Sequence, residues 1–234
     1  MKMEEIMTLI TAHSGCDGTA DNSIEFLDYA FGREVDCLEL DVRRDGKGRL
    51  ILSHDKAESS APLLETAFDR LKRHPEKMIN CDLKEENMEL SVLELAKHYG
   101  VENQIIYSGE VNLELIGKDN SRLEPVKIFL NIENLLPEIY EEPGAGKLHG
   151  QEYWEKVKNA LDKIPQYEIQ CINVDYHLWK EPFKQFLGAH NGKCSLWTVN
   201  EKEDIKSFLE DGVYNITTRT AKAALKIREE AGIR

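Results

Sequence analysis

Two carboxylates stand two residues apart within the apolar run Cys37–Arg43: Glu39 and Asp41. A run of this kind is typical of a β-strand that is covered on both faces. Side chains two residues apart on a strand leave the same face, so these two carboxylates repel each other unless a cation lies between them. Hard divalent ions such as Mg²⁺ and Ca²⁺ prefer carboxylate oxygens as ligands. The pair therefore predicts a metal site.

A third acid and a lysine have the same spacing further along the chain. Asp82 and Lys84 share one face of the strand predicted over Met78–Leu83 and its continuation. An apolar run does not need an acid at this place, so Asp82 is predicted to be a third oxygen ligand. Lys84 is predicted to meet an anionic group.

Two histidines complete the set of residues that can do chemistry. His13 directly follows the first apolar run of the chain. Arg44–Arg49 is too short for a crossover helix and rich in turn residues, which predicts a β-hairpin. A turn centred on Gly46-Lys47 would place His54 opposite Glu39, from a point fifteen residues further along the chain.

Two histidines, three carboxylates and a lysine at strand ends suit attack on a phosphodiester. A metal ion neutralises a phosphate oxygen, one histidine takes a proton from the nucleophile, and the other protonates the leaving alkoxide. Histidine suits both roles because its ordinary pKa lies near neutrality. This constellation predicts a metal-dependent phosphodiesterase.

The elements that must position these side chains alternate along the chain. The apolar runs predicted to be strands are Met7–Ala12, Cys37–Arg43, Leu50–Ser53, Met78–Leu83, Gln104–Ser108, Lys127–Ile132, Cys171–Asp175, Cys194–Val199 and Tyr214–Thr218. The amphipathic segments predicted to be helices are Ser23–Gly32, Pro62–Arg73, Asn87–Tyr99, Gln151–Ile164, Glu181–Ala189, Glu201–Asp211 and Ala221–Ala231.

This alternation predicts an α/β protein with a parallel sheet. With the hairpin counted as part of one unit, the 234 residues form eight β-α units. We therefore expect a single (β/α)₈ TIM-barrel domain over residues 1–234, with a β-hairpin extension after the second strand. The alternative is a doubly wound open sheet, but no Gly-rich dinucleotide fingerprint follows the first strand. The irregular segment Glu133–Gly150 follows a strand, and is either a lid over the active site or a surface loop.

Composition and charge exclude several classes of protein. Hydrophobic residues make up 41% and charged residues 31%, which is a globular composition. No apolar run is long enough for a transmembrane helix. Lys and Arg number 30 against 43 Asp and Glu, and a net charge of −13 disfavours binding to nucleic acid or anionic membranes. Five cysteines without a C-x-x-C spacing argue against a disulfide framework or a structural zinc site, and favour a reduced, cytoplasmic protein.

The stretch Ile10–Asp55 resembles the opening signature of the glycerophosphodiester phosphodiesterase family, which has a TIM-barrel fold and sits among the phospholipase C-like phosphodiesterases. The residues that carry the resemblance are Ile10–Gly15 for I-x-A-H-R-G, Asp21–Ser23 within P-E-N-T, Glu39–Val42 for E-x-D-V, Gly48–Asp55 within D-G-x-x-V-x-x-H-D, Asp82–Lys84 for E-x-K, Trp197–Asn200 for W-T-V-N, and Gly212-Val213 at the start of the closing motif.

The resemblance implies hydrolysis of a small glycerophosphodiester to glycerol 3-phosphate and an alcohol, with one divalent cation, Mg²⁺ or Ca²⁺, as cofactor. The roles that it implies are acid–base catalysis by His13 and His54, metal binding by Glu39, Asp41 and Asp82, phosphate contact by Lys84, and lining of the alcohol side by Trp197.

One departure from the family pattern concerns the phosphate. Ser14 stands where the family has an arginine that would pair with it. Loss of such a charge-assisted contact costs about 1.5–3 kcal/mol of binding. Arg43 and Arg219 are the candidates for supplying the missing charge, and solvated surface arginines are the alternative interpretation.

A second departure is the short segment Lys56–Ala61, where the family carries a substantial insertion. It predicts a more open pocket, or one covered by Glu133–Gly150. Two alternatives to the family reaction therefore stay open. One is a phosphodiesterase of altered specificity, lysophospholipase D-like or forming a cyclic phosphate. The other is a non-catalytic barrel that binds a phosphorylated ligand, although such a protein does not need an acid–base pair.

Overall fold

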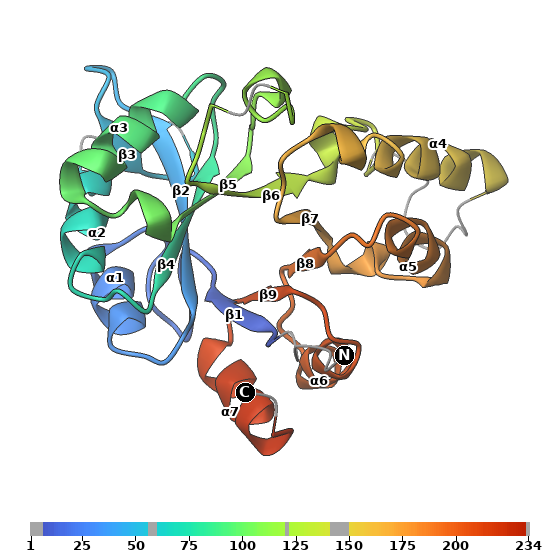
Figure 1. The fold of residues 1–234 in the computed structure, drawn as a ribbon. Helices are drawn as coiled ribbons and strands as arrows, with labels where there is room; N and C mark the ends of the chain where they lie inside the picture. Colours follow the sequence, from blue (N-terminus) through green and yellow to red (C-terminus); the bar gives the residue numbers. More distant parts are fainter. Residues whose placement is uncertain (1–6, 56–59, 120–121, 141–149, 233–234) are drawn as a thin grey trace.

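The computed structural model describes residues 7–55, 60–119, 122–140 and 150–232. Its parallel strands form a closed ring with the helices outside it (Figure 1). The ring closes because β1 pairs with β9 on one side and with β2 on the other. The barrel strands are β1 (Leu9–Ala12), β2 (Cys37–Arg44), β4 (Met78–Leu83), β5 (Ile105–Gly109), β6 (Lys127–Asn131), β7 (Cys171–Asp175), β8 (Cys194–Trp197) and β9 (Asn215–Thr218). The predicted (β/α)₈ barrel is confirmed, and the open sheet is excluded.

Helices cover the outside of the barrel wherever the sequence has an amphipathic segment. The α-helices are α1 (Ile24–Phe31), α2 (Leu64–Leu71), α3 (Glu89–Tyr99), α4 (Gln151–Leu161), α5 (Glu181–Gly188), α6 (Lys202–Glu210) and α7 (Ala221–Glu230). The 3₁₀ turns are η1 (Glu102–Gln104), η2 (Leu113–Leu115), η3 (Ile132–Asn134), η4 (Ile164–Gln166) and η5 (Tyr176–Leu178). Among the described residues, no helix is both long and apolar enough to cross a membrane.

Helix α1 shows how the local sequence sets these boundaries. The Ser23 hydroxyl accepts a hydrogen bond from the Phe26 amide, which satisfies one of the free N–H groups at the start of the helix. One face of the helix, including Phe26 and Leu27, is buried against the barrel. Between β5 and β6, by contrast, the described residues form the short turn η2 and no α-helix. That connection contains Gly117 and Pro125, which break helices.

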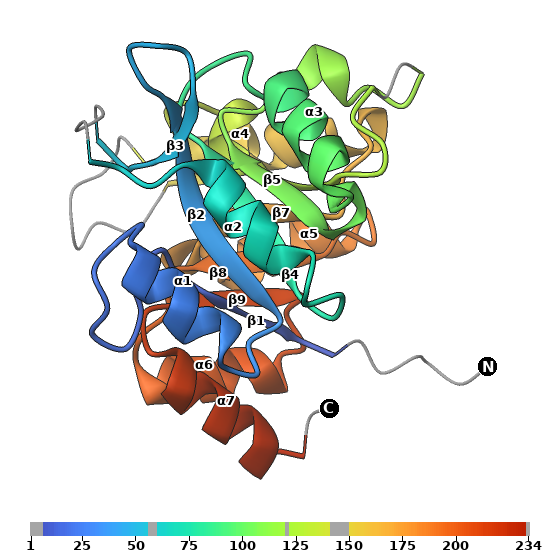
Figure 2. The same cartoon turned by 90° about the vertical axis from the view of Figure 1, so that its left-hand side faces the viewer.

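The hairpin after β2 is present, but its register differs from the predicted one by one residue. Strand β3 (Leu50–Leu52) pairs antiparallel with β2, with Val42 opposite Leu52. Figure 2 shows this hairpin extending beyond the barrel, at the upper left. The prediction that His54 lies opposite Glu39 is therefore wrong.

The cause is a longer turn than the one centred on Gly46-Lys47. The Asp45 amide donates to the Arg49 carbonyl, so Gly46–Gly48 form a three-residue loop. The Asp45 carboxylate accepts from the amides of Lys47 and Arg49, and Gly48 has a φ of 79°. A three-residue loop with a left-handed residue at its end is a common hairpin connection.

The interior of the barrel is layered. At the amino ends of the strands the packing is apolar and includes Cys37, Ile106, Phe129 and Cys171. The next layer towards the carboxyl ends is polar and hydrogen-bonded: Thr11 to Asn215, Asn215 to Ser195, Asn80 to Ser108, and Asn173 to Asn131. Each of these hydrogen bonds joins two neighbouring strands, so this layer supports the strand ends above it.

Gly109 at the end of β5 allows β4 and β5 to approach closely beside Asp82. Its φ is 77°, and a Cβ there would lie 2.8 Å from the Leu83 amide nitrogen and 2.9 Å from Asp82 Oδ1. Gly109→Ala is expected to destabilise the fold by about 2–4 kcal/mol, through the left-handed backbone and the clash. For a chain of this length the melting temperature should fall by about 5–10 °C. The control is Gly117→Ala, whose Cβ would meet nothing within 4 Å; equal melting temperatures for the two variants would contradict the prediction.

Candidate active site

Three carboxylates converge at the carboxyl ends of two neighbouring strands. Glu39 and Asp41 come from β2, and Asp82 from β4, where it pairs with Asp41 in the parallel register. One carboxylate oxygen from each lies within 4.8 Å of the others, and the group can hold a metal ion. Glu39 and Asp41 are buried. The three residues predicted from the sequence as ligands therefore form one cluster.

Each carboxylate is oriented through one oxygen by a neighbouring polar group. The Ser14 amide donates to Glu39 Oε2 at 2.9 Å, the Asn22 side chain to Asp41 Oδ2 at 2.7 Å, and the Ser108 hydroxyl to Asp82 Oδ1 at 2.6 Å. These bonds fix the carboxylates in place before any ligand arrives.

Asn22 and Ser108 are site residues that the sequence analysis did not single out. Asn22 forms two bonds to Asp41, because its Oδ1 also accepts from the Asp41 amide at 3.0 Å. It lies in the stretch Asp21–Ser23 that resembles the family's P-E-N-T, and that likeness was its signal in the sequence. Ser108 offers no such signal: its role follows from its place on β5, where it pairs with Asp82.

Lys84 lies among the carboxylates, as the shared strand face predicted. Its Nζ is 2.8 Å from Asp41 Oδ1 and also bonds Asp82 Oδ2. Burial by itself lowers the pKa of Lys84, but the charges of Asp82 and Asp41 outweigh it and raise the pKa above its ordinary value. The lysine is therefore a permanent positive charge at the edge of the cluster.

The cluster still holds excess negative charge, which affects the pKa of Glu39. Burial raises the pKa of Glu39 well above its usual range, and the repulsion from Asp41 and Asp82 raises it further. Burial also acts to raise the pKa of Asp41, but Lys84 and the bond from Asn22 lower it on balance. An added divalent cation would relieve the repulsion around Glu39, and the all-oxygen donor set fits a hard ion such as Mg²⁺ or Ca²⁺.

His13 lies beside this cluster, at the end of β1. Its Nδ1 is 3.7 Å from Glu39 Oε2 and 3.1 Å from the Ser14 hydroxyl. Burial, followed by the charge of Arg219, lowers the pKa of His13 to about 4. The imidazole is therefore neutral at pH 7, the form that can accept a proton.

His54 lies further out than His13. Its side chain is 66% exposed, and its Nδ1 is 3.2 Å from Asp55 Oδ1. The charge of His54 lowers the pKa of both Asp41 and Asp21, so it stands within electrostatic reach of the cluster. Among the described residues, the structure does not bring it into contact with Glu39 or His13.

The two arginines that could replace the family arginine are both engaged by acids. Arg219 forms a two-pronged ion pair with Asp21, at 2.7 and 2.9 Å, and also donates to the Gly15 carbonyl. Arg43 donates to the His54 carbonyl at 2.8 Å and lies 3.4 Å from Glu85. Since the charge of Arg219 is felt by His13, this arginine borders the site.

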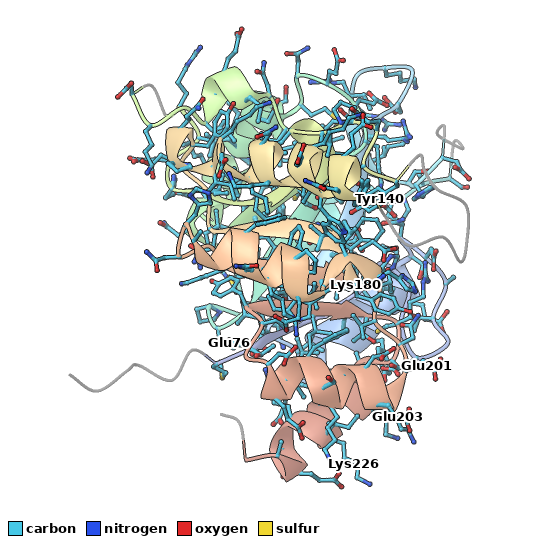
Figure 3. All side chains as sticks on the ribbon, turned by 90° about the vertical axis from the view of Figure 1, so that its right-hand side faces the viewer. Glu76, Tyr140, Lys180, Glu201, Glu203 and Lys226 are labelled. Atoms are coloured by element: carbon cyan, nitrogen blue, oxygen red, sulfur yellow. The ribbon has the colours of Figure 1, made fainter. Side chains whose placement is uncertain are left out.

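Trp197 at the end of β8 occupies the other side of the barrel mouth. Its ring meets the edge of the Tyr140 ring, with the centroids 6.0 Å apart. In Figure 3, Tyr140 lies towards the same side as Glu201, which follows β8, whereas Glu76, which precedes β4, lies on the opposite side. Tyr140 therefore lies on the face formed by the carboxyl ends of the strands.

Two predictions about loops fall at least partly outside the described residues. The segment Glu133–Gly150 is described up to residue 140, and residues 141–149 are not; its function as a lid stays a prediction. Of Lys56–Ala61, only residues 60 and 61 are described, so the predicted openness of the pocket also stays untested.

Known proteins were compared with the chain in sequence and in fold. No family model matches the chain. A curated glycerophosphodiester phosphodiesterase of Bacillus altitudinis is 25% identical over an alignment of 267 residues, covering 96% of this chain and 99% of the relative.

Solved structures show the same fold. A putative glycerophosphoryl diester phosphodiesterase of Agrobacterium tumefaciens superposes with a TM-score of 0.76 at 13% identity, over 97% of this chain and 100% of the other. A phosphodiesterase of Oleispira antarctica, solved in complex with the product sn-glycerol-3-phosphate, superposes with a TM-score of 0.68 at 13% identity, over 95% and 97% of the two chains. In sequence and in fold, the chain thus resembles the glycerophosphodiester phosphodiesterases, a group of phosphoric diester hydrolases, as its motifs predicted.

Proposed function

We propose that this protein is a metal-dependent enzyme that hydrolyses a glycerophosphodiester to glycerol 3-phosphate and an alcohol. The observation that carries the proposal is the convergence of Glu39, Asp41 and Asp82 beside a neutral His13. The Bacillus altitudinis relative is a glycerophosphodiester phosphodiesterase, and the Oleispira antarctica phosphodiesterase binds the product sn-glycerol-3-phosphate, which supports the same substrate class. The proposal takes residues 1–234 as a single barrel domain.

Glu39, Asp41 and Asp82 would hold one divalent cation, Mg²⁺ or Ca²⁺, which when bound supplies charge neutralisation at a phosphate oxygen. Lys84 places a second positive charge at the same edge, where it can meet the phosphate. Neutral His13 accepts or relays a proton at the reacting oxygen, and His54 is the other member of the acid–base pair.

The test is release of glycerol 3-phosphate from glycerophosphocholine and glycerophosphoethanolamine, with Mg²⁺, Ca²⁺ or Mn²⁺ and with a chelator. We expect metal-dependent release that the chelator abolishes. Release that persists at full rate in chelator would contradict the metal dependence, and no release with any metal would contradict the reaction.

A second candidate is a phosphodiesterase of altered specificity, lysophospholipase D-like or forming a cyclic phosphate, and Ser14 favours it. Ser14 is fully buried, its amide donates to Glu39, and its hydroxyl is hydrogen-bonded to the His13 ring. This position therefore offers no charge to a phosphate. Phosphorus NMR of the products separates the outcomes, since a cyclic phosphate and an acyclic monoester have different shifts. Activity on a lysophospholipid, measured beside activity on glycerophosphocholine, shows whether the enzyme is lysophospholipase D-like.

Arg219 is the better candidate for the missing phosphate charge, because its guanidinium already acts on His13. Arg219→Ala is expected to raise KM for glycerophosphocholine by about 10–100-fold, the loss of a charge-assisted hydrogen bond. The matched control is Asp21→Asn, which weakens the same ion pair but keeps the arginine. If the double variant Arg43→Ala/Arg219→Ala binds substrate as tightly as the wild type, neither arginine replaces the family residue.

The proposal includes a cytoplasmic location and a role in lipid metabolism. All five cysteines are free and buried. Free thiols are what a reducing compartment maintains. Fractionation of cells, with the protein followed by antibody, tests the location directly.

A further inference from the structure

Asn22 contacts both the side chain and the backbone of Asp41, one of the clustered carboxylates. Its Nδ2 donates to Asp41 Oδ2 at 2.7 Å, and its Oδ1 accepts from the Asp41 amide at 3.0 Å. Both residues are buried. Two bonds from one planar amide fix the Asp41 carboxylate relative to its own backbone, so the direction of its other oxygen is fixed as well.

Asn22 is itself held by the loop between β1 and α1. Its amide donates to the Ser14 carbonyl at 2.7 Å, which closes this loop on itself. A Cβ at Gly15 would lie 2.8 Å from the Asp21 amide nitrogen, so the glycine permits the close return of the chain. Asn22 has a φ of 53°, in the left-handed region that asparagine adopts more readily than most residues. The side chain of Asn22 therefore extends from a closely packed loop.

The same loop orients a second carboxylate. The Ser14 amide donates to Glu39 Oε2 at 2.9 Å, while the Ser14 carbonyl accepts from the Asn22 amide. Ser14 is fully buried. The two ends of one short loop thus orient two of the three clustered carboxylates, and the two ends are hydrogen-bonded to each other. Loss of the Asn22 side chain would loosen Asp41 directly.

Mg²⁺ and Ca²⁺ make different demands on a group of carboxylates. Mg²⁺ is the smaller ion and requires nearly regular octahedral geometry, whereas Ca²⁺ accepts more oxygens in flexible arrangements. Carboxylates that neighbouring groups hold in place therefore suit Mg²⁺, and freedom of movement in the carboxylates harms Mg²⁺ binding more than Ca²⁺ binding. Groups that orient a metal ligand matter for affinity, since their loss costs about 10–100-fold.

We propose that Asn22 is a positioning residue that favours Mg²⁺ over Ca²⁺ at the carboxylate cluster. This inference rests on the proposed function, in which the cluster holds a divalent cation, and deepens it by assigning a physical basis for the choice between the two ions. Asn22 acts through Asp41, whose carboxylate it holds by two bonds.

The test is calorimetric titration of the protein with Mg²⁺ and with Ca²⁺, without substrate. Asn22→Gly removes both side-chain bonds to Asp41 and keeps the backbone unstrained, because glycine adopts a left-handed φ freely. We expect the dissociation constant for Mg²⁺ to rise by about 10–100-fold. The constant for Ca²⁺ should rise less, so the ratio of the two constants shifts towards Ca²⁺.

The matched control is Asn191→Gly, the same substitution at another left-handed asparagine, with a φ of 52°, in the connection between α5 and β8. It should leave both dissociation constants unchanged. Melting temperatures in chelator report whether each variant is folded. If Asn22→Gly does not fold, Asn22→Ser takes its place, because serine keeps a small polar side chain there but is too short to make both bonds.

A merely structural role for Asn22 would lower the melting temperature and leave the ratio of the two dissociation constants unchanged. Equal losses for the two ions, or no loss, would therefore overturn the inference and leave the proposed function standing. Binding of neither ion by the wild type would contradict the metal dependence in the proposed function, and the inference would fail with it.

Discussion

Replacing His13 by alanine is expected to lower kcat for phosphodiester hydrolysis by about 10²–10⁴-fold, the usual contribution of a positioned acid or base. The physical reason is the place of this imidazole: its Nδ1 is 3.7 Å from Glu39, beside the carboxylate cluster, and its low pKa keeps it neutral. The measurement is the rate with glycerophosphoethanolamine, and with bis(p-nitrophenyl) phosphate as a second substrate. KM should change much less than kcat, because the histidine acts on the reacting atoms.

The matched control is His98→Ala, which removes an exposed histidine on α3, at a distance from the carboxyl ends of the strands. It should leave both rates unchanged. His54→Ala is expected to show a comparable loss with glycerophosphoethanolamine. With bis(p-nitrophenyl) phosphate, p-nitrophenolate leaves without a proton. Loss of the histidine that protonates the leaving group should therefore lower the rate less with this substrate. Full activity in His13→Ala would remove the role assigned to this residue.

Replacing Glu39 by glutamine is expected to abolish metal binding and, in chelator, to raise the melting temperature. The folded state raises the pKa of Glu39, so between about pH 4.5 and that raised pKa the folded state binds more protons than the unfolded state. Stability therefore falls as pH rises through this range, so the ionised form of Glu39 destabilises the folded state. Glutamine removes the charge and can still accept the bond from the Ser14 amide.

For a chain of this length, each 1 kcal/mol of added stability raises the melting temperature by about 2–4 °C. In the wild type, a cation at 100 times its dissociation constant should add about 2.7 kcal/mol. Glu39→Gln should lose this metal-dependent increase. The measurement is thermal unfolding at pH 7, with chelator and across a series of Mg²⁺ and Ca²⁺ concentrations.

Glu210→Gln is the control for loss of one negative charge, because Glu210 is an exposed acid on α6, 3.9 Å from Lys206. Its metal-dependent increase should equal that of the wild type. A lower melting temperature for Glu39→Gln in chelator would show that the ionised carboxylate stabilises the fold, against the argument from burial and repulsion. An unchanged response to metal would remove Glu39 from the ligand set.

The residues that converge at the site illustrate what short-range pattern can predict. Glu39 and Asp41, like Asp82 and Lys84, are two apart on apolar runs, so the period of a strand alone puts each pair on one face. Parallel neighbours then bring their carboxyl ends to the same edge, and the register of Asp41 with Asp82 completes the cluster. The pairing of β1 with β2 brings His13 to the same edge.

The position of His54 could not be predicted from short-range pattern. Its predicted level depended on the hairpin turn, and one extra loop residue, held by the Asp45 carboxylate, changed the register. A shift of one residue turns every following side chain to the other face of a strand. The choice between these turns depends on local hydrogen bonds that composition and spacing do not encode.

Local pattern in the sequence was enough to predict the barrel, the order of its elements and the three clustered carboxylates, because strand and helix periodicities and the ends of parallel strands are properties of local pattern. Tertiary structure alone decided which groups orient those carboxylates, namely Asn22 and Ser108, and that Arg219 is held by Asp21. These contacts join residues far apart in the chain, and they depend on closure of the ring and on burial, neither of which is a property of any one segment.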